Sequence, residues 1–310
     1  MKTIFQIRSS NKISWLQVTM WEPEGEIKGI LQISHGMKEH MERYDAFARY
    51  LNELGILVVG NDHIGHGKSV QDLDELGYFP SANGKNGAET AITDLHRLTQ
   101  IMKRRFGKVP YFLLGHSMGS FFARGYLCSY GQDITGAIIM ATGGFPPIIL
   151  QIANFLLKGG KWILGEKYKS KMLNAALNIY FNQNFQPVKT KADWISSDEE
   201  QVKKYLEDVR CNFDFTLNGF QVLLDVQMLI QNPENISRIP KNLPILFVSG
   251  AEDPLGEEGK GVKKIYRNYK AAGMKNMQLK LYPGARHEIL QEKERLKVYA
   301  DLGRWIEKNI

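Results

Sequence analysis

The sequence has few cysteines and no long hydrophobic run. Its 310 residues include two cysteines, Cys128 and Cys211, which are too few for a disulfide framework and indicate a reducing compartment. No stretch reaches the roughly 18 uninterrupted apolar residues of a membrane-spanning helix. Residues 1–8 have no sustained apolar core and no small-residue cleavage pattern, so we interpret them as a strand and not as a signal peptide. We therefore expect a cytoplasmic protein.

The sequence also lacks the patterns of nucleic-acid-binding and metal-binding proteins. The net charge is +7, but no zinc-finger, RNP-type or basic-zipper pattern accompanies it, so we expect dispersed surface charge and no nucleic-acid partner. Asp62-His63-x-x-His66 has no third and fourth ligand at a compatible spacing, which argues against a metal site. Gly65-x-Gly67 is not part of a full dinucleotide-binding pattern. We expect no cofactor and no metal.

What the sequence does contain is an alternation of short apolar strands with helices of amphipathic spacing. Strands are predicted over residues 13–21, 29–34, 56–59, 111–114, 134–140, 245–249 and 277–281. Helices are predicted over residues 41–54, 86–106, 120–130, 262–272 and 295–306. This alternation is typical of an α/β fold with a mostly parallel sheet and helices on both faces.

The alternation stops between about residues 145 and 240. This segment is rich in predicted helix and begins Phe145-Pro146-Pro147. We interpret residues 145–240 as a helical cap or lid insertion over the carboxyl ends of the strands, where open α/β sheets bind ligands. The catalytic domain then comprises residues 1–144 and 241–310.

The pentapeptide Gly115-His116-Ser117-Met118-Gly119 has the form G-x-S-x-G, and it lies between a predicted strand and a predicted helix. Strand, tight turn and helix are the context of a nucleophile elbow, in which the two glycines leave room for neighbouring elements. The turn strains the serine backbone and holds the hydroxyl above the sheet. We expect His116 to pack inside the elbow. A glycine-rich turn could contain a serine by accident, so the hypothesis of a nucleophilic Ser117 depends on its partners.

A nucleophilic serine needs a base, usually a histidine that a carboxylate orients. In this kind of sheet the chain order is serine, acid, histidine. Of the seven histidines only His287 lies downstream of Ser117, in a loop directly after a predicted strand. Asp253 occupies the loop after the strand over 245–249, with Glu252 as the competing acid. We prefer Asp253, because its short side chain suits a tightly held hydrogen bond to the histidine.

The tetrahedral intermediate of acyl transfer carries an oxyanion that needs preorganised donors. One donor should be the backbone amide of Met118, the residue after the nucleophile. The other should come from the loop after an early strand, where His35-Gly36-Met37 is placed for it. Gly36 permits close backbone approach, and the amide of Met37 is the candidate donor.

In order along the chain, these motifs resemble those of the monoglyceride lipase and lysophospholipase group of α/β-hydrolases (serine aminopeptidase S33-like): residues 35–40, Arg43-Tyr44, residues 61–69, residues 115–119, Asp253 and His287. The resemblance covers nearly the whole catalytic domain and is much weaker over 145–240. It implies an α/β-hydrolase fold and a small-molecule substrate that is an acyl ester, such as a monoacylglycerol or a lysophospholipid. Members usually have a small residue where Met37 stands, a departure that affects the shape of the acyl pocket.

Two other functions stay open. A proline-iminopeptidase-like aminopeptidase would need acidic cap residues to hold a substrate amine, and the available ones are Glu166, Glu199, Glu200, Glu207 and Asp208. A non-catalytic ligand receptor on the same fold would not need a complete set of Ser117, Asp253 and His287. A serine at the nucleophile position, in place of aspartate, argues against dehalogenase or epoxide-hydrolase chemistry.

The cap begins with an apolar stretch over residues 148–157, which is followed by Lys158, Lys161, Lys167, Lys169 and Lys171. One interpretation is a helix that buries one face against the catalytic domain. The other is a lid whose apolar side lines an acyl channel while its lysines approach phospholipid headgroups, which would give peripheral membrane contact. Both interpretations stay open, as does the oligomeric state.

Overall fold

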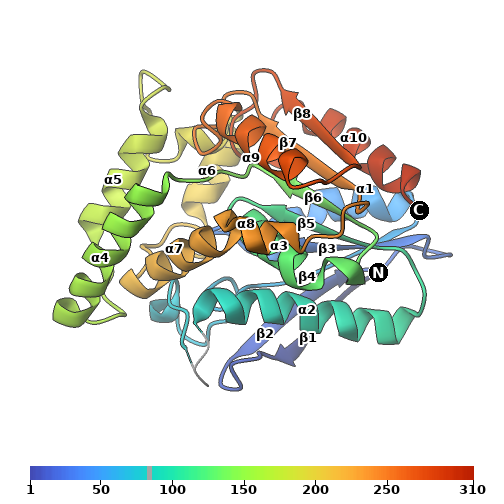
Figure 1. Ribbon diagram of the computed structural model, residues 1–310, viewed down its shortest axis with the longest axis horizontal. Helices are drawn as coiled ribbons and strands as arrows, with labels where there is room; N and C mark the ends of the chain where they lie inside the picture. Colours follow the sequence, from blue (N-terminus) through green and yellow to red (C-terminus); the bar gives the residue numbers. More distant parts are fainter. Residues whose placement is uncertain (82–85) are drawn as a thin grey trace.

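The apolar runs of the sequence form the inner strands of one eight-stranded sheet (Figure 1). The computed structural model describes residues 1–81 and 86–310. Its strands are β1 (Lys2–Arg8), β2 (Trp15–Trp21), β3 (Gly29–Ser34), β4 (Ile56–Asn61), β5 (Tyr111–His116), β6 (Gly136–Met140), β7 (Ile245–Gly250) and β8 (Met277–Tyr282). They lie in the order β1-β2-β4-β3-β5-β6-β7-β8.

Strand direction and burial agree with the predicted α/β architecture. The pairs β1/β2 and β2/β4 are antiparallel, and the pairs from β4/β3 to β7/β8 are parallel. Strands β3 to β7 are buried along their whole length, because helices cover both faces of a parallel sheet. The edge strands β1 and β8 alternate between more and less exposed residues. The prediction of a mostly parallel sheet is confirmed.

Helices cover the two faces of the sheet, and two hydrophobic clusters lie between them and the strands. The helices α1 (Asp45–Glu53) and α10 (Arg295–Lys308) pack on one face. The helices α2 (Gly87–Phe106), α3 (Met118–Tyr130) and α9 (Lys260–Ala271) pack on the other. Short 3₁₀ turns connect these elements: η1 (Met41–Tyr44), η2 (Leu73–Glu75), η3 (Gly131–Asp133) and η5 (Ile289–Gln291).

The ends of helix α2 show why the sequence pattern predicted it within one residue. The Asn86 side chain accepts a hydrogen bond from the Glu89 amide at 2.9 Å, which satisfies one of the free donors at the start of the helix. Gly107 ends the helix with a φ of 73°, a conformation that glycine adopts at little cost. The three basic residues of its last turn, residues 103–105, complement the helix dipole.

The segment over 145–240 is fully described and consists of helices joined by loops. They are α4 (Pro147–Leu164), α5 (Lys171–Asn182), η4 (Asp193–Ile195), α6 (Glu199–Glu207), α7 (Leu217–Gln231) and α8 (Pro233–Ser237). Helices α4 and α5 stand at one end of the sheet, on the left in Figure 1, whereas α7 runs beside α3. Val226 and Ile230 of α7 belong to the same hydrophobic cluster as α2 and α3. The boundaries at 145 and 240 stay a prediction, and within them α7 contributes to the main core.

In the described part of the chain, no helix combines the length and the apolar character that crossing a membrane requires.

Candidate active site

Ser117 lies on a sharp turn between β5 and α3, as the elbow prediction required. Its φ is 52°, in the left-handed region, where a residue with a side chain is strained by about 1–3 kcal/mol. A Cβ atom on Gly115 would lie 2.4 Å from the Gly119 carbonyl oxygen, and one on Gly119 would lie 1.9 Å from the Ser34 carbonyl oxygen. Glycine is therefore the residue that fits both positions, because a side chain on Gly115 would push α3 away from β5 and one on Gly119 would push it away from β3.

Asp253 and His287 come from the loops that follow β7 and β8, and their side chains meet. His287 Nδ1 lies 2.9 Å from Asp253 Oδ1, which also accepts the Leu255 amide at 3.0 Å. The Ser249 hydroxyl donates to Asp253 Oδ2 at 2.9 Å. Burial opposes the charge on Asp253, but His287 and these donors hold the pKa of the carboxyl below its usual range. The competing acid, Glu252, is exposed.

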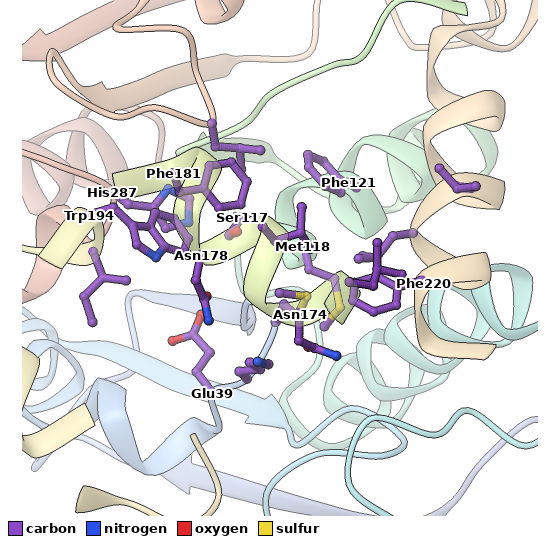
Figure 2. A pocket seen from close by; sticks show the side chains of 18 of the residues that line it. Glu39, Ser117, Met118, Phe121, Asn174, Asn178, Phe181, Trp194, Phe220 and His287 are labelled. Carbon is purple, nitrogen blue, oxygen red and sulfur yellow. The ribbon is translucent and has the colours of Figure 1, made fainter. Parts of the chain in front are cut away.

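This arrangement leaves His287 able to act as a base toward Ser117. With Nδ1–H directed at Asp253, Nε2 is the free nitrogen of the imidazole. Ser117 and His287 line the same cavity (Figure 2). The ring of Trp194, from η4, lies 4.7 Å from the His287 ring and covers it. The structure therefore joins Asp253 to His287 by a hydrogen bond and places His287 and Ser117 on one cavity.

The loop after β3 lies directly against the serine. A Cβ atom on Gly36 would lie 3.1 Å from Ser117 Cβ, so the absence of a side chain there permits the close approach. In the described structure, the amides of Met37 and Met118 donate no hydrogen bond to the protein. Met118 is the first residue of α3, where amides have no partner within the helix. Both amides are thus free to bind an oxyanion formed at Ser117.

Glu39 is a buried carboxylate that the sequence analysis did not single out. Its Oε1 accepts hydrogen bonds from the Gly36 amide and from the Tyr44 hydroxyl at 3.1 Å, and it lies 2.6 Å from His116 Nδ1. Burial opposes both charges, yet the pairing lowers the pKa of Glu39 and raises the pKa of His116. His116 is therefore more than a packing residue, because its ion pair with Glu39 ties the elbow to the loop after β3.

Arg43 extends this network to the loop that carries His287. Its guanidinium donates to both oxygens of Glu288 at 2.6 and 2.7 Å and reaches Glu39 Oε2 at 3.3 Å. Positive and negative side chains alternate along this network, so each buried charge contacts a charge of opposite sign. Such pairing offsets the cost of removing a charge from water. The sequence signal was the motif over residues 35–44, but Glu288 lies 245 residues from Arg43 and no pattern indicates that pairing.

His63 and His66, for which the sequence predicts no metal site, are buried beside Ser117 and its neighbouring loops. His63 Nε2 lies 3.0 Å from the Ser34 hydroxyl, and the His63 amide donates to His35 Nε2 at 2.9 Å. Burial lowers the pKa of His63 to about 3 and that of His66 to about 4, and it lowers the pKa of His35 strongly as well. These imidazoles are therefore neutral, and they pack and bond beside the catalytic loops.

One trio of side chains in the described chain has the donor types of a metal site. The ligand atoms of His40, Asp208 and Cys211 lie within 4.8 Å of one another, and His40 Nε2 is 2.8 Å from Asp208 Oδ2. Burial raises the pKa of the Cys211 thiol. The hydrogen bond between His40 and Asp208 accounts for the arrangement by joining the loop after β3 to the insertion.

Ser117 and His287 open into a cavity of about 590 Å³ between the sheet and the insertion. Its apolar wall comes from α4, α5 and α7, through side chains that include Leu150, Leu157, Leu173, Phe181, Phe220 and Leu224. Its polar wall comes mostly from the loop after β3 and from the insertion near residues 191–212. In Figure 2, Glu39 and Phe220 lie on different sides of Ser117. The cavity therefore has a largely apolar side and a polar side that carries its charged groups.

The sequence is similar to known proteins over most of its length. Residues 25–294 match the family model described as serine aminopeptidase, S33. The chain is 28% identical over 292 residues to a monoglyceride lipase homolog of Monkeypox virus, covering 92% of each chain. It is 26% identical over 301 residues to the monoglyceride lipase of Rattus norvegicus, covering 94% of this chain and 86% of that one.

The fold is also similar to that of a solved enzyme. A thermostable carboxyl esterase from Bacillus coagulans, solved in complex with glycerol, superposes with a TM-score of 0.90 at 28% identity. The superposition covers 99% of this chain and 98% of the esterase.

Proposed function

The chain belongs to the serine aminopeptidase S33 family of α/β-hydrolases, and on that premise we propose that it hydrolyses carboxylic esters of lipid type. The substrate class is that of a monoacylglycerol lipase or lysophospholipase. The observation that carries the proposal is the cavity at Ser117, whose apolar wall suits an acyl chain and whose polar wall suits an alcohol. The names of the relatives, monoglyceride lipase above all, support the same substrate class.

The proposed mechanism uses residues of this chain and water. Ser117 Oγ attacks the ester carbonyl while His287 Nε2 accepts its proton, and Asp253 holds the imidazole and stabilises the imidazolium. The amides of Met37 and Met118 bind the oxyanion. His287 then returns the proton to the departing alcohol, which leaves an acyl-serine. Water, deprotonated by His287, attacks the acyl-serine and releases the fatty acid and free Ser117.

The acidic residues of the insertion favour the ester over an aminopeptidase substrate. Each of the five that an aminopeptidase could use has a partner in the protein, and in the described structure no acidic side chain of the insertion lines the cavity. The partners are Tyr78 for Glu166, Lys189 for Glu199, Lys204 for Glu200, Lys203 for Glu207 and His40 for Asp208. An amine in the cavity would therefore find no free carboxylate from the insertion.

The primary test is the replacement Ser117→Ala. Hydrolysis of p-nitrophenyl butyrate should be almost abolished, and a fluorophosphonate probe should label the unmodified protein but not the variant. The matched control is Ser237→Ala, which changes an exposed serine of α8. This variant should retain both ester hydrolysis and labelling by the probe. Wild-type rates in Ser117→Ala would refute the assignment, and an unlabelled wild-type protein would favour a non-catalytic receptor. Faster hydrolysis of proline naphthylamide than of monoacylglycerol would favour the aminopeptidase.

The outer surface of the insertion supports a second proposal, contact with a membrane surface. Helices α4 and α5 expose large apolar side chains, among them Ile148, Phe155, Trp162, Ile163 and Ile179. Lys158, Lys161, Lys167, Lys169 and Lys171 lie on the same two helices or between them. Apolar groups flanked by lysines bind anionic lipid surfaces by insertion and charge attraction.

Sedimentation with anionic liposomes tests this surface. Replacing the five lysines by glutamine should reduce binding, because each basic residue near an anionic surface contributes about 1 kcal/mol. The control replaces five exposed lysines on α9 and in the loop that follows it: Lys260, Lys263, Lys264, Lys270 and Lys275. Equal binding by both variants and the wild type would contradict membrane contact through the cap.

A further inference from the structure

Two lysines line the polar side of the cavity without an acidic partner at hydrogen-bonding distance. The lysines, carboxylates and histidines of the wall are Lys38, Glu39, His116, Lys191, His287 and Glu288. Glu39 is bound by His116 and Arg43, and Glu288 is bound by both arms of the same arginine. The two wall carboxylates are thus already occupied, which leaves Lys38 and Lys191 as cations available to a ligand.

Lys38 directly follows Met37, whose amide is placed to bind the oxyanion. Among the described residues its ammonium has no ion pair and no hydrogen bond, and it lies 5.9 Å from the centre of the Phe213 ring. Burial lowers the pKa of Lys38 to about 8, although Asp214 raises it, and Lys191 lowers it further. The ammonium is therefore charged at neutral pH but poorly solvated, and an anion in the cavity would stabilise it.

The backbone of Lys38 gives a second, independent observation. Its φ is 59°, in the left-handed region that glycine and asparagine adopt more readily than lysine. Strained conformations of this kind cluster at active sites and ligand-binding sites. Lys191 is the other cation at this wall, and its ammonium donates to Asn212 Oδ1 at 2.5 Å, a neutral partner that leaves its charge uncompensated.

We propose that the polar side of the cavity receives an alcohol half that carries a phosphate, and that Lys38 together with Lys191 recognises this group. The inference rests on the proposed ester hydrolysis and specifies its substrate as an acyl ester of a phosphorylated alcohol, such as a lysophospholipid with an exposed phosphate. The reaction consumes one water, breaks the acyl–oxygen bond and yields a fatty acid and the phosphorylated alcohol. The phosphate itself is not transferred.

The test compares two esters that differ in the phosphate alone, 1-octanoylglycerol and 1-octanoylglycerol 3-phosphate, as monomers in solution. The measured quantity is the ratio of kcat/KM for the phosphate ester to kcat/KM for the neutral ester. Lys38→Asn should lower this ratio by about tenfold, because a charge-assisted hydrogen bond to phosphate is lost. Lys38→Arg should restore most of it. An unchanged ratio in Lys38→Asn would overturn the proposal.

Lys12→Asn is the matched control. Lys12 is also a lysine with a left-handed φ, of 65°, but it lies in the exposed turn between β1 and β2. Its replacement removes the same charge and relieves the same backbone strain away from the cavity. We expect no change in the ratio, and an equal fall in both variants would mean that the overall charge of the protein sets the preference, against the proposal.

A binding experiment keeps this inference separate from the proposed reaction. In Ser117→Ala protein, calorimetric titration should show glycerol 3-phosphate binding more tightly than glycerol, and Lys38→Asn should remove the difference. Inorganic phosphate is the third ligand, and binding equal to that of glycerol 3-phosphate would indicate an anion site unconnected with the alcohol. If neither ester is hydrolysed by the wild type, the proposed function fails while this titration still decides the phosphate site.

Discussion

At the scale of single residues, Asp253 depends on three donors to stay charged while fully buried. His287, the Leu255 amide and the Ser249 hydroxyl all donate to its two oxygens. A buried carboxylate with these partners is a fixed negative charge, and it can select the imidazole tautomer that leaves Nε2 unprotonated. Its contribution to turnover is thus an effect of geometry and charge on His287.

Asp253→Asn should therefore lower kcat by roughly 10³- to 10⁴-fold, because an amide can present a donor to Nδ1 and favour the wrong tautomer. Ser249→Ala removes one of the three donors and should cost about tenfold or less. Steady-state kinetics with p-nitrophenyl butyrate measures both effects, and circular dichroism checks that the variants fold. Comparable losses in the two variants would show that the whole acid loop, and not the charge of Asp253, supports His287.

At the scale of secondary-structure elements, the site depends on how closely α3 approaches β3. Gly119 allows this approach, because its Cα lies against the carbonyl groups of Ser34 and His35. In the proposed mechanism, the amides of Met118 and Met37 bind the same oxyanion. This requires the helix and the strand to be in contact.

Gly119→Ala should destabilise the protein by about 1–3 kcal/mol and remove most of its activity, because the new methyl group would overlap two backbone oxygens. Gly159→Ala, in α4, is the matched control, since a Cβ atom there meets nothing within 4 Å. That change should be neutral or stabilise its helix by about 0.5–1 kcal/mol. Urea unfolding and esterase assays would measure both variants, and equal behaviour would refute close packing at the elbow.

At the scale of the whole molecule, the buried histidines should control stability in mild acid. His35, His63 and His66 have pKa values lowered below the ordinary 6.5, so the unfolded chain takes up their protons before the folded one does. Folded-state stability is then full above about pH 6.5 and is lost as the pH falls toward 4. The pKa of His116 is raised, so His116 is protonated in both the folded and the unfolded chain well below pH 6.5. It therefore does not add to the pH dependence of stability in that range.

The free energy of unfolding should accordingly fall by up to roughly 4 kcal/mol per pH unit below pH 6, about 1.4 for each of three histidines. The raised pKa values of Asp62 and Asp94 oppose this loss as the pH falls further. Urea unfolding at several pH values measures the slope. His66→Phe, which places a phenyl ring among Phe79, Phe213 and Phe215, should reduce it by about one third. A slope unaffected by this change would contradict the assignment.

Much of the fold could be predicted from the sequence, because local patterns determine it. The strands over 29–34 and 245–249 are continuous apolar runs, and the helix over 86–106 has a clear cap, apolar face and terminal glycine. The same locality identified Ser117 and the loops of Asp253 and His287. The network from Glu288 through Arg43 to Glu39 could not be predicted, since it joins side chains that meet only after the sheet has formed. The left-handed backbone of Lys38 has no local signal either.

Because Trp194 lies against His287, the fluorescence of this tryptophan should report the protonation state of the histidine. The indole lies 4.7 Å from the imidazole and stacks on Phe181, so its surroundings are ordered and unlike those of an indole in water. A protonated imidazole in contact with an indole quenches its fluorescence. In a chain that retains Trp194 and carries phenylalanine in place of Trp15, Trp21, Trp162 and Trp305, light emission would report when the base holds a proton, during a single turnover and without any attached dye.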